Sequence, residues 1–141
     1  MTKEISAEAH DIAERVEKFV RDKIFAYEKD ARCEDHGPTD ELVQEMRVLA
    51  REAGVLTPHI REDGSHLTHL ETALVLRKSG LSPLGPLAVN TFAPDEGNMY
   101  LLGKCASPEQ QERFLEPLVS GRERSAFFMT EPASENGAGS D

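Results

Sequence analysis

Residues 103–132 read GKCASPEQQERFLEPLVSGRERSAFFMTEP, and the pattern within them changes once. Ser107, followed by proline and then by Gln110, has the pattern of a helix start, and Gly121 is typical of the position after a helix end. Pro117 lies inside this helix and is expected to end or kink it. The run SAFFMT that follows is short, apolar and aromatic, which predicts a buried β-strand.

Three longer helices are predicted in the first 80 residues, because apolar residues recur there at spacings of three and four. Thr68 and Glu71 have the spacing of a capping box, in which each side chain caps a main-chain N–H of the other residue. Thr39 or Asp40 caps the middle helix, which ends before Gly54. The predicted helices cover residues 6–30, 39–53 and 68–79.

Two shorter helices are predicted between residues 82 and 103. Ser82, followed by proline, has the pattern of a cap and a first helical residue, and this helix is expected to end near Phe92. Pro94 with two acidic residues after it starts the next helix, and Gly103 is expected to stop it. The chain is therefore predicted to be all-helical up to Arg124 and to turn to β-structure at its end.

Charge and composition argue against several classes of protein. The 141 residues carry 16 Lys and Arg against 26 Asp and Glu, and the resulting formal charge of −10 opposes the phosphate backbone of nucleic acids. Cys33 and Cys105 lie far apart and outside any zinc-ligand spacing. His66 and His69 are three residues apart, but no matching carboxylate or cysteine pattern accompanies them. We therefore expect no nucleic-acid partner, no metal site and no disulfide framework.

The sequence contains no run of about 18 apolar residues, which is the length that a membrane-spanning helix needs. Its first residues, MTKEISAEAHD, show neither the apolar core of a signal peptide nor the Arg-rich character of a transit peptide. We expect a single cytoplasmic domain without membrane contact.

The sequence ends in GAGSD, residues 137–141, which has the composition of a loop that approaches a ligand closely. Gly137 and Gly139 permit positive φ and close main-chain approach, and successive N–H groups in such a loop can face a polar group. Taken alone, such a loop is more often a surface turn, and the TEP of residues 130–132 is more often a simple strand end. The order in which these pieces follow one another is far more specific than any one of them.

In that order, residues 103–141 resemble the segment that joins the N-terminal helical domain of acyl-CoA dehydrogenases to their β-domain. The resemblance covers FLEPLVSG and the residues before it, the aromatic residue ahead of TEP, and the Gly-x-Gly-Ser-Asp loop. NTFAPDEGNM at 90–99 is similar to the branch of that family that is fused to aminoglycoside-phosphotransferase-like domains. The resemblance implies an all-α bundle of about six helices at 1–124, of the acyl-CoA dehydrogenase fold, and the first strand of the β-domain within 125–141.

The resemblance also implies FAD as the cofactor, a fatty acyl-CoA substrate, and α,β-dehydrogenation with hydride transfer to flavin N5. The main chain of Phe128 and Met129 would border the flavin ring, and Thr130 would donate hydrogen bonds to its pyrimidine end. Fixed donors there stabilise the negative charge that develops around flavin N1 and C2=O. Ser140 would lie near the thioester arm of the substrate, at the edge of the FAD site.

The sequence departs from the commoner family pattern in two ways. Residues 133–136 intervene between TEP and the glycine loop, which puts the placement of Ser140 in doubt and leaves that of Thr130 well supported. The family's catalytic Glu belongs to a C-terminal four-helix domain beyond this sequence, so we expect no catalytic residue here, and Glu131 is not the missing base. We expect an N-terminal fragment, inactive alone, of a homo-oligomeric parent enzyme with an electron-transfer flavoprotein or a similar acceptor.

Two other functions fit parts of the sequence. An acyl-CoA oxidase-like flavoenzyme would share the fold and the motifs, and would differ in the reaction of its reduced flavin with oxygen. A stand-alone helical interaction module without activity fits the short length, but it leaves the C-terminal glycine loop without a purpose. In the chain as given, SAFFMT lacks partner strands, so we expect it to be frayed, repacked or paired with another copy.

Overall fold

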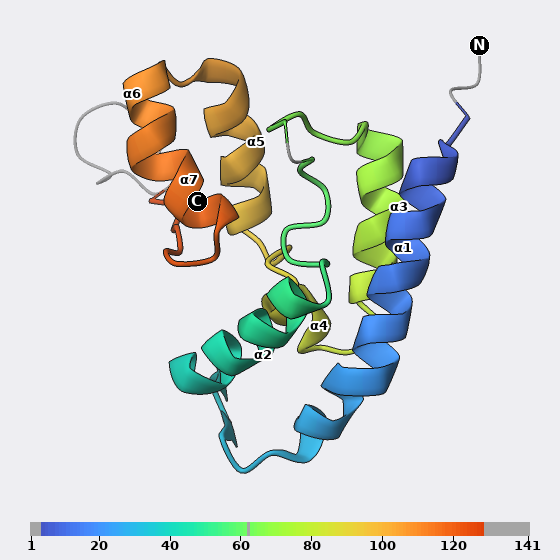
Figure 1. Ribbon diagram of the computed structural model, residues 1–141. Helices are drawn as coiled ribbons and strands as arrows, with labels where there is room; N and C mark the ends of the chain where they lie inside the picture. The colour runs from blue at the N-terminus through green and yellow to red at the C-terminus, as the bar shows by residue number, and fades with distance from the viewer. Residues whose placement is uncertain (1–3, 62, 129–141) are drawn as a thin grey trace, which may run out of the picture.

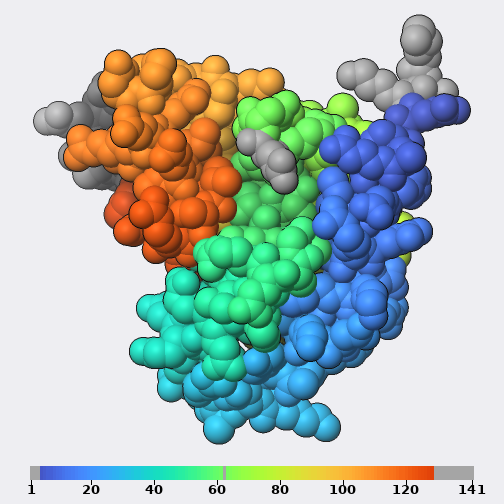
Figure 2. Space-filling model, viewed as in Figure 1, coloured from blue at the N-terminus to red at the C-terminus, as the bar shows by residue number. Residues whose placement is uncertain are grey.

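A computed structural model describes residues 4–61 and 63–128, which form a helical fold with one very short two-stranded sheet. Helices α1 and α3 lie side by side at one side of the molecule, and α5, α6 and α7 form the other side (Figure 1). Helices α2 and α4 pack against each other below, and the loop between α2 and α3 runs between the two sides (Figure 1). This loop and α2 also separate the two sides on the face seen in Figure 2. Apart from this small sheet, the predicted helical fold is confirmed for the described residues up to the end of α7.

The first predicted helix is formed as a composite of three helical types. Helix α1 (Ala7–Phe19) begins at Ser6, whose hydroxyl accepts a hydrogen bond from Ala9 N. It continues as the π-helical turn η1 (Val20–Ile24) and the 3₁₀ turn η2 (Phe25–Lys29). Its apolar stripe is buried as the sequence predicts, and the tighter last turn directs the chain away from the axis of α1.

A short hairpin that the sequence did not indicate follows η2. Strand β1 (Cys33–Glu34) pairs antiparallel with β2 (Gly37–Pro38), and Gly37 adopts a φ of 112° that favours glycine. Arg32 fixes the start of the hairpin by donating to both carboxylate oxygens of Asp30, at 3.0 and 2.8 Å. The Arg32 guanidinium lowers the pKa of Asp30 to about 2.

The next two helices begin at the residues that the sequence predicted. Thr39 caps α2 (Asp40–Glu52) by accepting from Leu42 N at 3.3 Å. Thr68 caps α3 (His69–Ser79), and its predicted capping box with Glu71 is present in both directions. Because these caps are local hydrogen bonds, the residue types alone were sufficient to place them.

One continuous core joins α1, η1, α2, α3 and α4 (Gly85–Ala88). Gly85 lets α4 lie directly against the end of α3, since a Cβ built there would be 1.9 Å from the carbonyl oxygen of Ser79. The fully buried apolar side chains of this core are listed here: Val16, Val20, Ile24, Leu42, Met46, Ala50, Val75, Ala88 and Val89.

The two short helices differ from their predicted limits. Ser82 does not cap α4; its hydroxyl accepts from Leu84 N in a turn, and the helix begins only at Gly85. A helix from residue 83 would meet Pro86, which lacks the N–H for an interior helical bond, so Pro86 instead occupies the first turn of α4. Helix α5 (Asp95–Cys105) runs through Gly103 rather than stopping there.

The predicted sixth helix is present in three parts. Ser107 and Gln110 form the predicted capping box of α6 (Pro108–Gln110), which continues into the π-helical turn η3 (Gln111–Leu115) and α7 (Glu116–Val119). The change from η3 to α7 falls just before Pro117, as the missing N–H of proline requires. Gly121 ends this unit with a φ of 70°.

Residues 123–128 follow without regular secondary structure. Only the first four residues of the predicted strand, 125–128, are among those described, and they are not paired in a ladder. Its remaining residues, and the predicted glycine loop, lie outside the described residues.

Candidate functional site

The end of α7 is held by side chains from elsewhere in the chain. Main-chain carbonyls at the end of a helix lack intrahelical partners, and here side chains of α2 and of two loops supply them. Four consecutive carbonyls each accept one such bond: Leu118 from Asn90 at 2.8 Å, Val119 from Thr57 at 2.6 Å, Ser120 from Arg51 at 2.8 Å, and Gly121 from Arg47 at 2.8 Å. We call these four donors the α7 anchor.

Two residues of the α7 anchor have strained backbones. Thr57 and Asn90 have φ values of 49° and 59°, a region that non-glycine residues rarely occupy, least of all a β-branched threonine. Both are buried and joined to each other, since Asn90 Nδ2 donates to Thr57 Oγ1 at 2.9 Å. Thr57 N also donates to the carbonyl of Val89 at 2.9 Å. These bonds hold the strained conformations in place, and strain of this kind is concentrated at functional sites.

Asp95 holds the next part of the chain. It is 2% exposed, and its Oδ1 accepts from both N and Oγ of Ser125 at 2.7 Å each. Asn98 Nδ2 donates to the same Ser125 hydroxyl at 2.8 Å, and Arg124 forms a looser ion pair with Asp95 at 3.9 Å. We call the contacts of Asp95 and Asn98 with Ser125 the Ser125 clamp. It ties the first residue of the predicted strand to the start of α5.

An open apolar hollow lies beside the Ser125 clamp. Its volume is about 590 Å³, and it is enclosed by α5, by η3 with α7, and by residues 123–125. Apolar side chains form most of its wall, and Phe114 and Leu101 on its lining are 47% and 57% exposed. Exposed large apolar side chains gathered around a hollow are characteristic of a binding surface. Arg113 and Arg124 add two positive charges to this lining, and Glu123 adds one negative charge.

A second hollow of about 400 Å³ borders the hairpin and α4. Phe92, which is 43% exposed, lines it together with Leu84 and Leu87. Arg124 lines both hollows, so the segment that leaves α7 passes between them. Both lie along the course of residues 122–128.

The structure places only one of the predicted cofactor residues. Phe128 is 98% exposed and Phe127 is 58% exposed, so no described element covers either ring. Met129, Thr130 and Ser140 lie outside the described residues, and their predicted contacts stay predictions. Among residues 4–61 and 63–128, no cluster of three or more His, Cys, Asp or Glu side chains could hold a metal ion.

A planar flavin ring would need an uncovered stretch of chain beside it. Phe127 and Phe128 offer such a stretch because they are exposed, and Ser125 ahead of them is held by Asp95. The described residues form no enclosed pocket around Phe128, so the other walls of a flavin site would come from elsewhere.

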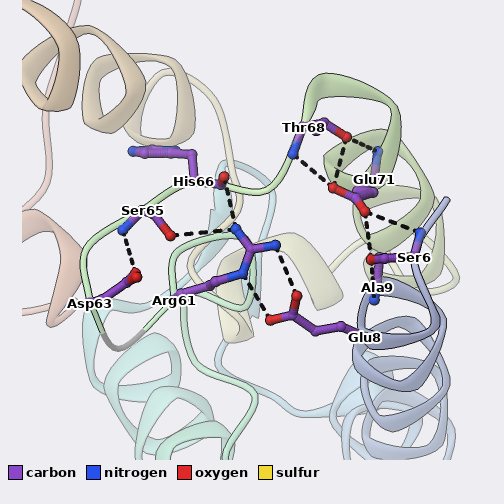
Figure 3. Close-up of polar contacts among 9 residues, drawn as sticks. All are labelled: Ser6, Glu8, Ala9, Arg61, Asp63, Ser65, His66, Thr68 and Glu71. Carbon is purple, nitrogen blue, oxygen red and sulfur yellow. Dashed lines mark hydrogen bonds and ion pairs between the residues drawn. The ribbon is translucent and has the colours of Figure 1, made fainter. Parts of the chain in front are cut away.

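A polar cluster around Glu71 joins the starts of helices α1 and α3. Glu71 accepts from N and Oγ of Ser6 and from N and Oγ of Thr68, so one carboxylate caps the starts of both α1 and α3 (Figure 3). These hydrogen bonds, the one from the Ser6 hydroxyl above all, lower the pKa of Glu71 to about 2. Arg61 pairs with Glu8 across the same region at 2.8 and 2.9 Å (Figure 3). A carboxylate so fully paired is suited to structure rather than to proton transfer.

Sequence reasoning missed the importance of Asp95 and Arg47. Asp95 was interpreted as an ordinary acid of a first helical turn, and Arg47 was not singled out at all. Arg47 is fully buried, and burial lowers its pKa, while the negative charge of Asp95 acts in the opposite direction. The buried contacts of both residues are with segments 30 or more positions away, for which the sequence carries no local signal.

Comparison with known proteins defines the class. The model of the family "Acyl-CoA dehydrogenase, N-terminal domain" matches residues 6–122. The chain belongs to the acyl-CoA dehydrogenase family, and the match ends where the α7 anchor holds the chain. In the described residues, no helix is long and apolar enough to cross a membrane.

Individual relatives agree with this class. The chain is 35% identical over 138 residues to "Probable acyl-CoA dehydrogenase FadE2" of Mycobacterium tuberculosis, with 92% of this chain and 33% of that protein covered. It is 29% identical over 135 residues to "Acyl-CoA dehydrogenase family member 11" of Gallus gallus, covering 90% of this chain and 17% of that one. A solved structure of a Mycobacterium abscessus protein assigned as an acyl-CoA dehydrogenase superposes with a TM-score of 0.72 at 30% identity, covering 94% of this chain and 36% of that one. The chain thus spans about a third or less of these relatives.

Proposed function

We propose that this chain is the N-terminal α-helical domain of an FAD-dependent acyl-CoA dehydrogenase, which removes hydrogen from the α and β carbons of a fatty acyl-CoA thioester. The family match over residues 6–122, together with the coverage of only a third of FadE2, is the observation that carries the proposal. The domain boundary falls near residue 124, where the Ser125 clamp begins. The parent is a cytoplasmic homo-oligomer and passes its electrons to an electron-transfer flavoprotein or a similar acceptor.

The hollow between α5 and α7 takes part of the acyl chain in this proposal. Its apolar wall removes hydrocarbon from water, which stabilises binding by about 0.8 kcal/mol for each buried CH₂ group. Arg113 and Arg124 on its lining favour anionic groups, and a CoA thioester carries several. Asn98 supplies a polar group beside the same hollow.

The strand that follows Ser125 carries the cofactor contacts in this proposal. Bound FAD would supply the hydride acceptor. The main chain of Phe128 and Met129 would lie along its ring, and Thr130 would donate hydrogen bonds to its pyrimidine end. Ser140 approaches the thioester arm. The general base comes from the C-terminal domain of the parent, so the 141-residue chain alone is inactive.

The decisive experiment uses the longer protein, in which this chain is joined to the β-domain and C-terminal domain of its family. Purified protein with bound flavin is mixed, without oxygen, with saturated acyl-CoAs of increasing chain length, and the flavin absorbance is recorded. The proposal expects bleaching by at least one acyl-CoA and formation of the enoyl product. Bound flavin that no acyl-CoA bleaches would show that the substrate class is wrong.

Admission of oxygen after reduction separates the two flavoenzyme alternatives. A dehydrogenase keeps its flavin reduced for long periods, whereas an acyl-CoA oxidase reoxidises it rapidly and releases hydrogen peroxide. Failure of the longer protein to retain any flavin would favour the helical interaction module instead.

A further inference from the structure

The chain between the end of α7 and Ser125 is fixed at both ends. At residues 118–121 the α7 anchor supplies one side-chain donor to each carbonyl, at distances of 2.6 to 2.8 Å. At Ser125 the carboxylate of Asp95 accepts from both N and Oγ, each at 2.7 Å. Only three residues, 122–124, lie between these two attachments.

After Ser125 the attachment ceases abruptly. Phe127 and Phe128 are 58% and 98% exposed, and the side chains of residues 126–128 are all apolar. An extended chain advances at most about 3.6 Å per residue, so Phe128 lies within about 11 Å of Ser125. The position at which Ser125 is held therefore limits where the next residues can lie.

Asp95 is the part of this arrangement best suited to control that direction. Hydrogen bonds to an ionised carboxylate are stronger and shorter than neutral ones, and two of them converge on one oxygen of Asp95. The Arg124 guanidinium faces Asp95 at 3.9 Å. Burial lowers the pKa of Arg47 on α2, and the negative charge of Asp95 acts in the opposite direction.

We propose that Asp95 is a positioning residue, which acts through Ser125 to orient the segment that contacts the flavin. This inference rests on the proposed function, because it is the resemblance to the family that places Phe128, Met129 and Thr130 against the cofactor. Asp95 itself touches neither the cofactor nor the reacting atoms. Its effect is to aim the donor groups of residues 128–130, and misaligned donors stabilise the reduced flavin less well.

The first test concerns the clamp alone and needs no flavin. Amide hydrogen exchange at Ser125 is measured in the 141-residue chain for wild type, Asp95→Ala, Asp95→Asn and Glu96→Ala. Asp95→Ala is expected to speed exchange at Ser125 at least tenfold while leaving the core amides of α3 protected. Asp95→Asn keeps an acceptor oxygen and recovers part of the protection. Glu96→Ala changes the neighbouring, more exposed acid and is expected to have no effect. Unchanged exchange at Ser125 in Asp95→Ala would refute the clamp.

The second test reads the cofactor in the longer protein. Asp95→Ala is compared with Val75→Ala, which removes a buried side chain from α3 far along the chain from the clamp. Both variants are expected to lose stability. Only Asp95→Ala is expected to shift the visible flavin spectrum and to weaken FAD binding at least tenfold. It should also lower kcat by a larger factor than it raises KM. Asp95→Asn is expected to restore most of the spectrum.

The outcomes separate this inference from the proposed function. If the wild-type protein binds flavin and Asp95→Ala has the wild-type spectrum and FAD affinity, the positioning role is wrong while the proposed function stands. Equal effects of Asp95→Ala and Val75→Ala would reduce Asp95 to a purely structural residue. If the wild-type protein binds no flavin, the proposed function fails and the cofactor role of Asp95 fails with it, whatever the exchange at Ser125 shows.

Discussion

Replacement of His59 by leucine is expected to make the stability of the chain less sensitive to acid. His59 is fully buried, and in the described part of the chain neither ring nitrogen has a hydrogen-bond partner. Burial, with a smaller contribution from the positive charge of His66, lowers the pKa of His59 to about 4 from its ordinary 6.5. The folded state therefore holds His59 neutral at a pH where the unfolded chain binds a proton.

The sign and size of the effect follow from this difference in proton binding. Between pH 6.5 and pH 4 the unfolded state binds more protons than the folded state, so stability is full above pH 6.5 and is lost as the pH falls toward 4. Each pH unit in this range costs about 1.4 kcal/mol, so the free energy of unfolding should fall by about 2 kcal/mol between pH 7.5 and pH 5.

Urea unfolding followed by circular dichroism at these two pH values measures the difference. His59→Leu is expected to abolish most of the 2 kcal/mol fall. At pH 7.5 it should change the free energy of unfolding by no more than about 1 kcal/mol, because no hydrogen bond is lost. His10→Leu, which alters an exposed histidine of α1, is the matched control and should leave the fall unchanged. The explanation is wrong if wild type shows no fall, or if His59→Leu shows the full one.

Three further substitutions test the packing and the caps. Glu71→Gln should lower the free energy of unfolding at pH 7 by up to about 3 kcal/mol. The difference between variant and wild type should vanish as the pH falls from 4.5 toward 2, because protonation of Glu71 removes the same contribution from the wild type. Urea titrations across this pH range measure the difference. Gly85→Ala forces a Cβ to within 1.9 Å of a carbonyl oxygen and should cost about 3 kcal/mol or prevent folding. Gly97→Ala, in open space on α5, should instead stabilise the fold by about 0.5–1 kcal/mol. Thermal unfolding compares the two variants, and equal losses of stability would contradict the packing at Gly85. Asn90→Ala removes two buried hydrogen bonds and should destabilise the fold by about 2–4 kcal/mol. Asn90→Gly should cost about 1 kcal/mol less, because glycine accepts a φ of 59° without strain. Equal losses in denaturant unfolding would mean that backbone strain at this residue is negligible.

Local chemistry allowed most of the helices to be predicted from the sequence. Thr68 and Glu71 are three residues apart and cap each other, and Ser107 with Gln110 does the same. A cap of this kind involves neighbours in the chain, so its residue types carry the information. The family resemblance, which rests on residues 103–141, is likewise written in contiguous motifs, and the match to residues 6–122 confirms the family.

The errors occur where a distant contact overrides a local signal. Gly103 was expected to end its helix, but glycine inside a helix costs only about 1 kcal/mol, and α5 continues past it. A Cβ at this position would lie 3.1 Å from Nε2 of His66, so Gly103 is explained by the approach of the 53–68 loop. The two-residue strands of the hairpin are too short to produce an alternating pattern at all.

The candidate site was the least predictable part, for the same reason. The Ser125 clamp joins residues 30 positions apart, and the α7 anchor joins residues up to 74 apart. An acid after a proline looks the same in a sequence whether it faces water or a buried serine. The predicted contacts of Met129, Thr130 and Ser140 depend on residues that the structure does not describe, so they stay predictions.

The α7 anchor has a mechanical consequence. A helix that ends in free carbonyls can bend at its last turn, and such a turn often acts as a hinge. Here the four donors come from α2 and from two loops of the core, so a force applied to the chain beyond Gly121 loads several bonds at once instead of one after another. A displacement of residues 122–128 is therefore expected to move the helical core as one rigid body, without bending at the end of α7.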